Sequence, residues 1–388
     1  MHAIAEDMSV RMYGPDEAAT DRRLRVELDN LRAARDIARA QGRDDIRVGI
    51  TLAVNEVAIW RDLREVWAWA LELADDAGLA DHPQRVAILS SAADAARFTG
   101  DLDRAGRLAD EAFTLAGPHL DPRQVHRAWS ARGGVAHFRG DFARARESWL
   151  RFAEAWPPEA GAFLASAALA AAYGGDPSDA RELLDRAHAA VGRSGCGSHA
   201  AFAAYVEGEL LAIDRVEQSV PFYVEAIEGA RTVGANFVDG VAGVALASAR
   251  TRIGDVPGAA AGFGYLIDFW RRTGQTTQLW TTARNAAGLL SALGRSRTAA
   301  LLLICADAAP GAAAVGPEIA RFSGRAFTPV AELVDEAVLV ELRAEAVRLD
   351  AGAVLDQAVA ELHELAGVEA SEPVSDSSPV VLPPLAQS

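Results

Sequence analysis

The sequence predicts an all-α protein built as a solenoid of helical hairpins, and three observations support this prediction. Half of the 388 residues are hydrophobic but only 7% are aromatic, and alanine dominates the hydrophobic half. Such a composition suits close-packed helices better than a β-rich core. Apolar residues recur at helical spacing, and one short sequence motif recurs along the chain at a nearly constant interval.

In this motif a glycine is followed five residues later by an alanine. The five copies begin at Gly100, Gly140, Gly175, Gly254 and Gly294. The intervals are 40 (100 to 140), 35 (140 to 175), 79 (175 to 254) and 40 (254 to 294) residues. Because 79 is close to two repeats, a degenerate copy is expected between them, and Asp214 divides that interval. A further copy is expected 40 residues before Gly100, at Trp60–Asp62.

The motif is interpreted as the turn of a helical hairpin. Glycine ends a helix in a left-handed conformation, and the aspartate that often follows caps the next helix. The alanine lies on the inner face of the second helix, where a small side chain lets two backbones approach closely. Since one hairpin cannot bury both of its faces, six or seven of them are expected to stack into one continuous core.

Residues 126–157 resemble a unit of the tetratricopeptide repeat (TPR) family. The residues at the family's spacing are Trp129, Gly133, Gly140, Phe142, Ala145 and Pro157. The other units keep less of the pattern, and the spacing near 40 exceeds the usual 34. The resemblance implies a right-handed α-solenoid of TPR-like helical hairpins.

A second resemblance starts at Tyr13–Ala19, which runs into Arg25–Ala34. This segment resembles the beginning of the C-terminal repeat region in bacterial STAND/NB-ARC-type ATPase transcriptional regulators of the LuxR and SARP types. Leu333–Leu365 resembles the closing helices of such arrays. We see neither the ATPase module nor a DNA-binding or cyclase domain within the 388 residues. The chain is therefore either a stand-alone descendant of the sensor half or a reading frame separated from its upstream partner.

Four segments are expected. They are a partly ordered N-terminal leader (1–20), the TPR-like repeat array (21–325), acidic closing helices (326–367) and a disordered tail (368–388). The closing helices would cap the open end of the solenoid, because terminal repeats need a polar face. The proline- and serine-rich composition of the tail cannot build a packed core.

Charge excludes several functions. A net charge of −16 disfavours direct nucleic-acid contact, which depends on clustered cations. All 38 basic residues are arginine, so a Walker A loop and Schiff-base chemistry, which both need lysine, are excluded. Cys196 and Cys305 fit reduced thiols. With no secretory signal pattern and no apolar run long enough for a bilayer, a cytoplasmic protein is expected, with no membrane association.

We assign no catalytic residue, cofactor or metal site from the sequence. The tryptophans fit packing between helices better than a ligand box, and the histidines lack zinc-helix spacing. The concave groove that first helices line in TPR arrays remains the candidate surface for a protein partner. The family pattern places six residues there: Ser90, Asp94, Arg97, Arg127, His137 and Arg284.

The leading hypothesis is a non-catalytic protein–protein interaction scaffold, the sensor or regulatory repeat region of, or derived from, a STAND-type signalling ATPase or transcriptional regulator. Its expected partner is a protein, such as an upstream ATPase or regulator module. The alternatives are a stand-alone TPR adaptor unrelated to transcription, a DNA-contacting transcriptional regulator, and a helical-repeat enzyme whose catalytic groups meet only in three dimensions.

Overall fold

The structure is a computed structural model that describes residues 1–117, 122–309 and 330–367, and within these ranges the chain is helical with no strand. Two helices come first, α1 (His2–Arg11) and α2 (Glu17–Ala40). Seven hairpins follow: α3 (Asp44–Ala58) with α4 (Arg64–Asp75), α5 (Arg85–Thr99) with α6 (Leu102–Leu115), α7 (Pro122–Phe138) with α8 (Phe142–Ala155), α9 (Ala160–Tyr173) with α10 (Pro177–Ser194), α11 (Gly197–Leu211) with α12 (Val216–Val233), α13 (Asn236–Ile253) with α14 (Val256–Thr273), and α15 (Thr276–Ala292) with α16 (Ser296–Ala308).

Beyond the hairpins, residues 330–367 form the described helices α18 (Val330–Leu333), α19 (Glu336–Arg348) and α20 (Ala351–Leu365). They cover the last hairpin, since α20 packs on α14 and α16 and α19 packs on α16. Leu342 and Leu362 are fully buried at these contacts. The predicted leader, 1–20, contains α1 and the start of α2. The predicted tail, 368–388, lies outside the described residues.

The predicted turns are confirmed. The glycines that begin the five copies of the motif all have positive φ, between 78° and 94°. In four copies the aspartate caps the next helix, because its side chain accepts a hydrogen bond from the backbone N–H three residues later. The alanines that end the five copies of the motif are fully buried, as expected for a close hairpin: Ala105, Ala145, Ala180, Ala259 and Ala299.

Both degenerate turns are also present. The chain turns at 212–214, and Ser219 takes the place of the buried alanine. At the earlier turn Asp62 has a φ of 54°, the left-handed conformation that glycine adopts in the other copies. The all-α solenoid of helical hairpins predicted from the sequence is therefore correct.

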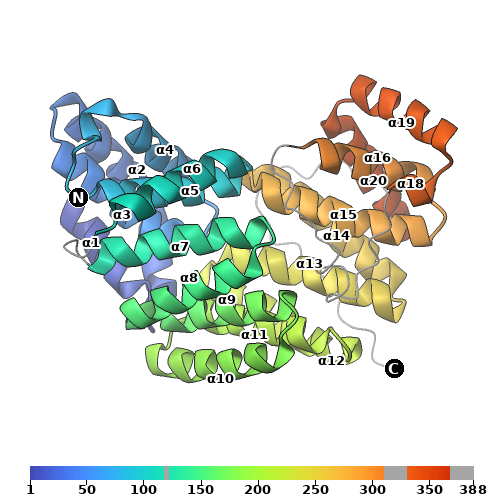
Figure 1. Ribbon diagram of the computed structural model, residues 1–388, viewed down its shortest axis with the longest axis horizontal. Helices are drawn as coiled ribbons and strands as arrows, with labels where there is room; N and C mark the ends of the chain where they lie inside the picture. The colour runs from blue at the N-terminus through green and yellow to red at the C-terminus, as the bar shows by residue number, and fades with distance from the viewer. Residues whose placement is uncertain (118–121, 310–329, 368–388) are drawn as a thin grey trace.

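The array curls until its later hairpins meet its earlier ones (Figure 1). Helix α15 packs on α5, where the Thr277 hydroxyl donates to the Arg97 carbonyl at 2.9 Å. The Gln275 amide bonds to Asp62 in the turn before α4. The Phe237 N–H donates to the Trp60 carbonyl at 3.0 Å. These contacts close one superhelical turn, so the first helices of six hairpins, α5 to α15, surround a common centre.

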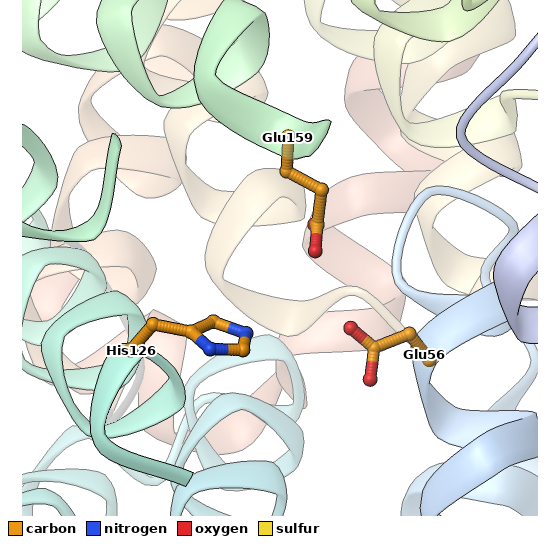
Figure 2. Close-up of side chains that lie close together, drawn as sticks. All are labelled: Glu56, His126 and Glu159. Atoms are coloured by element: carbon orange, nitrogen blue, oxygen red, sulfur yellow. The ribbon is translucent and has the colours of Figure 1, made fainter. Parts of the chain in front are cut away.

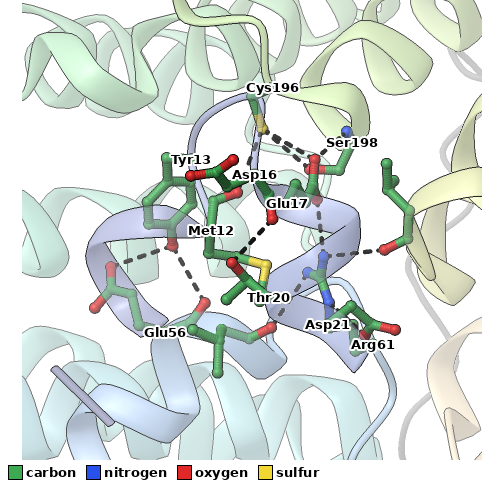
Figure 3. A network of polar contacts seen from close by, with 12 residues as sticks. Met12, Tyr13, Asp16, Glu17, Thr20, Asp21, Glu56, Arg61, Cys196 and Ser198 are labelled. Atoms are coloured by element: carbon green, nitrogen blue, oxygen red, sulfur yellow. Dashed lines mark hydrogen bonds and ion pairs between the residues drawn. The ribbon is translucent and has the colours of Figure 1, made fainter. Parts of the chain in front are cut away.

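The N-terminal helices strengthen this closure through a buried polar network (Figure 3). Arg61 donates to Glu17 at 2.8 Å and to Asp21 at 3.0 Å, and it also donates to the carbonyl of Val233 at the end of α12. The second carboxylate oxygen of Glu17 accepts from the Ser198 N–H at 2.8 Å. The network therefore ties α2 and the α3–α4 turn to α11 and α12, far along the sequence.

Hydrophobic cores run continuously between the stacked hairpins. One core extends from α7 to α13 and the next from α13 to α20. The predicted free thiols are both buried, with Cys196 beside Glu17. Across the described ranges, each helix falls short of the length or the apolarity that crossing a membrane requires.

Candidate functional site

A central cavity of about 360 Å³ lies inside the closed turn. All six first helices from α5 to α15 contribute side chains to it. Its volume is within the ~300–1,000 Å³ range of small-molecule sites. The concave side of the described array, where the sequence placed a groove lined by first helices, thus holds a central cavity.

In each of the five hairpins whose turn contains the repeated glycine, two positions of the first helix line the cavity. The first lies two residues before the glycine and is occupied by Phe98, Phe138, Tyr173, Arg252 and Ala292. The second lies six residues before it and is occupied by Asp94, Gly134, Leu169, Ser248 and Gly288. Residues four apart share one helix face. The repeat register therefore determines which side chains point to the centre.

Aromatic side chains form much of the wall. Trp60 lies against Phe202 and Phe237, with ring centroids 5.3 Å and 5.8 Å apart, and Phe237 also meets Phe98 at 5.8 Å. Other aromatic rings come from α7, α8, α9, α11 and α14: Phe138, Trp149, Phe163, Tyr173, Tyr205 and Phe263. The sequence assigned the tryptophans to packing, and Trp60 and Trp149 in addition face the cavity.

The wall formed by α15 is different. Its lining residues are Gln278, Thr281, Arg284, Asn285, Gly288, Leu289 and Ala292, with no aromatic ring among them. In the ring of first helices α15 lies across from α9, which contributes Phe163 and Tyr173. Among the first helices from α5 to α15, α15 is thus the one whose described lining residues include no aromatic ring.

Hydroxyl groups of the lining are engaged by their own helices. Ser166, Ser248, Thr251 and Thr281 each donate to the carbonyl four residues earlier, at 2.8–3.0 Å. A hydroxyl held in this way is not paired with a general base, as a catalytic nucleophile requires. The orientation of these four hydroxyls is therefore set by the backbone of their own helices.

His137 is a neutral polar group at the cavity. Burial, helped by the charge of Arg97, lowers the pKa of the imidazole to about 4. Its Nδ1 is buried without a hydrogen-bond partner in the described structure. The ring lies 5.3 Å from Trp149 and 5.8 Å from Tyr173. At neutral pH His137 therefore offers a hydrogen-bonding nitrogen within an aromatic setting.

Of the six residues predicted for the groove, four line the cavity: Asp94, Arg97, His137 and Arg284. The structure places the other two elsewhere. Ser90 is buried and donates to the Val86 carbonyl at 2.7 Å. Arg127 forms an ion pair with Glu56 of α3, so the N-terminal helices cover this end of the inner face.

The sequence analysis missed the aromatic side chains of the lining and most of the polar side chains of α15, where it named only Arg284. The signal that would have found some of the aromatic residues, Phe98, Phe138 and Tyr173, is the distance of each residue from its turn glycine. Counting back two and six residues identifies ten lining residues, including Phe138, Tyr173 and Ser248.

A second polar group consists of Glu56, His126 and Glu159, whose side chains point toward one another (Figure 2). Their potential ligand atoms lie within 4.8 Å of one another. Arg127 already forms an ion pair with Glu56, and the Tyr13 hydroxyl donates to the Glu56 carbonyl at 3.2 Å. Burial raises the pKa of Glu159 to about 7, against the opposing charge of Arg127. Since the guanidinium supplies the cation, this group is a buried ion-pair network, and we assign no metal to it.

Comparisons with known proteins identify no family. No family model matches the sequence, and no curated protein matches it. Among solved structures, the chain is similar to a Rap protein crystallised in complex with competence and sporulation factor. The TM-score is 0.49 with 14% sequence identity, over 82% of this chain and 87% of that one.

Proposed function

We propose that this chain is a non-catalytic sensor module that binds a small ligand in its central cavity and a protein partner on its outer surface. The cavity carries the proposal, because side chains from six hairpins line one chamber. A ligand there would contact hairpins that are distant in sequence at the same time. Binding would therefore stabilise the closed form of the array over any more open form.

Two further features favour binding over catalysis. Four lining hydroxyls are held by backbone carbonyls of their own helices, and His137 is neutral at physiological pH because burial lowers its pKa to about 4. Aromatic walls with a few placed polar groups are typical of small-molecule sites. The resemblance at Tyr13–Ala19 and Arg25–Ala34 extends the proposal, since it links the array to the regulatory half of signalling ATPases and transcriptional regulators.

The test uses a matched pair of variants. Ser166→Trp places an indole in the cavity wall, whereas Ser178→Trp places the same side chain on the exposed start of α10. The full-length protein is screened against a small-molecule library by thermal shift, and any ligand retained through purification is identified by native mass spectrometry. We expect S178W to bind like the wild type and S166W to lose binding while keeping the far-UV circular dichroism of the wild type.

Two results would contradict the proposal. A folded S166W protein that binds as well as the wild type would show that the ligand lies elsewhere. The absence of any small-molecule binding by the wild type would remove the sensor role and leave the adaptor alternative.

A further inference from the structure

We infer that the ligand of the central cavity is a neutral aromatic compound that carries an O–H or N–H donor. This inference rests on the proposed function and adds the chemical class of the ligand. Three features of the described lining carry it: the concentration of aromatic rings, the pairing of the lining charges inside the protein, and a side-chain oxygen on α15 that can accept a hydrogen bond.

Aromatic side chains are concentrated at the cavity. Phenylalanine, tyrosine and tryptophan make up 7% of the sequence but ten of the 31 residues of the described lining. Tyr173 presents its ring to the cavity, because its hydroxyl donates to Glu209, a buried residue outside the lining. Flat aromatic groups pack on such rings with a stacking geometry that saturated groups cannot adopt. The lining therefore favours an aromatic ligand.

Three ionisable side chains of α5 and α7 together leave no net charge at the cavity. The Arg97 guanidinium donates to Asp94 at 3.0 Å, and both side chains are nearly buried, at 10% and 13% exposure. The central carbon of Arg97 also lies 4.1 Å from the Phe98 ring centroid and 5.1 Å from that of Phe138. His137 is neutral at physiological pH, because burial lowers the pKa of its imidazole to about 4. The Arg97–Asp94 pair is thus a neutral unit of the wall.

The other two guanidinium groups of the described lining also have acidic neighbours. Arg284, whose side chain is only 11% exposed, donates to Asp307 at 3.0 Å and to a backbone carbonyl at 3.3 Å. Arg252 donates to the Ala212 carbonyl and lines, together with the buried Glu209, a small void beside the cavity. An ionic ligand would therefore lose its hydration without meeting an unpaired charge, which favours a neutral ligand.

One amide on α15 has an oxygen that can accept a hydrogen bond from a ligand. The Asn285 side chain lines the cavity, and its Nδ2 donates to the Thr281 carbonyl at 2.9 Å. Since only the NH2 end of an amide can donate to a carbonyl, this bond fixes the orientation of the group. Among the described residues, Oδ1 of Asn285 receives no donor. A ligand with an O–H or N–H group would supply one.

The cavity has room for such a molecule. About 360 Å³ accommodates a compound of two or three fused rings. Its donor would lie at Asn285 on α15, and its rings would lie toward Phe163 on α9 and Phe202 on α11, across the ring of first helices.

The test compares five probes that share a two-ring skeleton. 2-Naphthol is neutral and aromatic and carries the donor. 2-Methoxynaphthalene lacks the donor, decahydro-2-naphthol lacks the aromatic rings, and 2-naphthoate and 2-naphthylmethylammonium carry opposite charges. Dissociation constants are measured by isothermal titration calorimetry on the full-length protein at neutral pH and constant ionic strength.

We expect 2-naphthol to bind at least about 10-fold more tightly than either ion, because no unpaired charge in the lining replaces the hydration of an ion. It should bind about 3- to 10-fold more tightly than each of the two neutral analogues, since one lacks a hydrogen bond and the other lacks ring stacking.

Variants then locate the donor contact. Asn285→Leu removes the acceptor and keeps a similar volume, so 2-naphthol and 2-methoxynaphthalene should bind this variant within about 2-fold of each other. Asn285→Ala gives the same prediction if the leucine variant does not fold. The control is Asn30→Leu on the exposed side of α2, where the asparagine also bonds within its own helix, to Glu27 at 2.9 Å. The control should leave the preference for 2-naphthol intact.

The outcomes separate the two levels of the proposal. Binding of an ion as tight as that of 2-naphthol, with loss of that binding in S166W, would overturn the inference and keep the proposed function. Equal binding of decahydro-2-naphthol would overturn the aromatic class of the ligand. A preference for 2-naphthol over 2-methoxynaphthalene that persists in the Asn285 variants would overturn the donor contact. If the wild type binds no probe, the inference fails, and the library screen decides the proposed function on its own.

Discussion

Replacing Arg61 by methionine tests the closure of the array directly. The Arg61 side chain is completely buried, and it pairs with two carboxylates that are themselves almost inaccessible, Glu17 at 1% and Asp21 at 7% exposure. In the variant Glu17 keeps the Ser198 N–H, and Asp21 keeps the partly exposed Arg25. Removing one partner of a buried ion pair costs about 3–5 kcal/mol, because a charge remains buried without compensation.

The measurement is equilibrium urea unfolding of the R61M protein, combined with amide hydrogen exchange in α2 and α12. We expect a loss of stability of about 3–5 kcal/mol and faster exchange in both helices, since Arg61 also donates to the carbonyl of Val233. The control is Arg151→Met, whose exposed side chain pairs with the exposed Glu154 at 3.5 Å. An exposed pair of this kind should cost no more than about 1 kcal/mol.

One result would refute the reasoning. If R61M lost no more stability than R151M, the buried network would not be holding the N-terminal helices to α12. Adding Glu17→Gln to R61M offers a further check, because removing the uncompensated charge should restore part of the lost stability.

Three further predictions follow from local structure. Gly240→Ala should destabilise the protein by about 1–3 kcal/mol in thermal unfolding, since its Cβ would lie 2.2 Å from the Trp270 ring. The control Gly192→Ala, in open space on α10, should instead stabilise the protein by about 0.5–1 kcal/mol. Equal effects of the two substitutions would contradict the packing of Gly240 against Trp270. Cys196 should react with iodoacetamide at pH 8 only after unfolding, because burial raises its thiol pKa to about 12; rapid labelling of the native protein would show that the closure opens. Burial raises the pKa of Asp62 to about 7, so the contribution of its protonated carboxyl to stability is fully present below about pH 4 and is lost as the pH rises to about 7. The Asp62→Asn protein should therefore gain stability over the wild type, and the gain should be larger at pH 8 than at pH 5. A gain that does not change with pH would contradict the raised pKa.

The sequence was sufficient to predict the hairpins and their turns. The reason is that each turn is determined locally. A glycine with positive φ, an aspartate cap and a small residue five positions later occupy one short segment, as at Gly100, Asp101 and Ala105. Even the degenerate turn at Asp62 follows the same register.

The closure could not be predicted, because it depends on pairs that lie far apart in the chain. Thr277 bonds to Arg97 across 180 positions, and Gln275 bonds to Asp62 across 213. Repeat spacing reports that hairpins stack, but it does not report the small rotation from one hairpin to the next that sets the curvature. The prediction therefore described a concave groove without its closure, and it placed Arg127 in that groove, whereas the structure pairs Arg127 with Glu56 of α3.

The closed turn changes what the loss of a repeat would mean. In an open array each repeat contacts only its neighbours, so the stability is nearly a sum over repeats and a terminal unit can be deleted. Here α15 also packs on α5, and α12 on α2. Deleting the last hairpin would therefore uncover surfaces at both ends of the chain at once. Unlike a linear array, this protein cannot be shortened or extended one repeat at a time during evolution without rebuilding the contact that closes it.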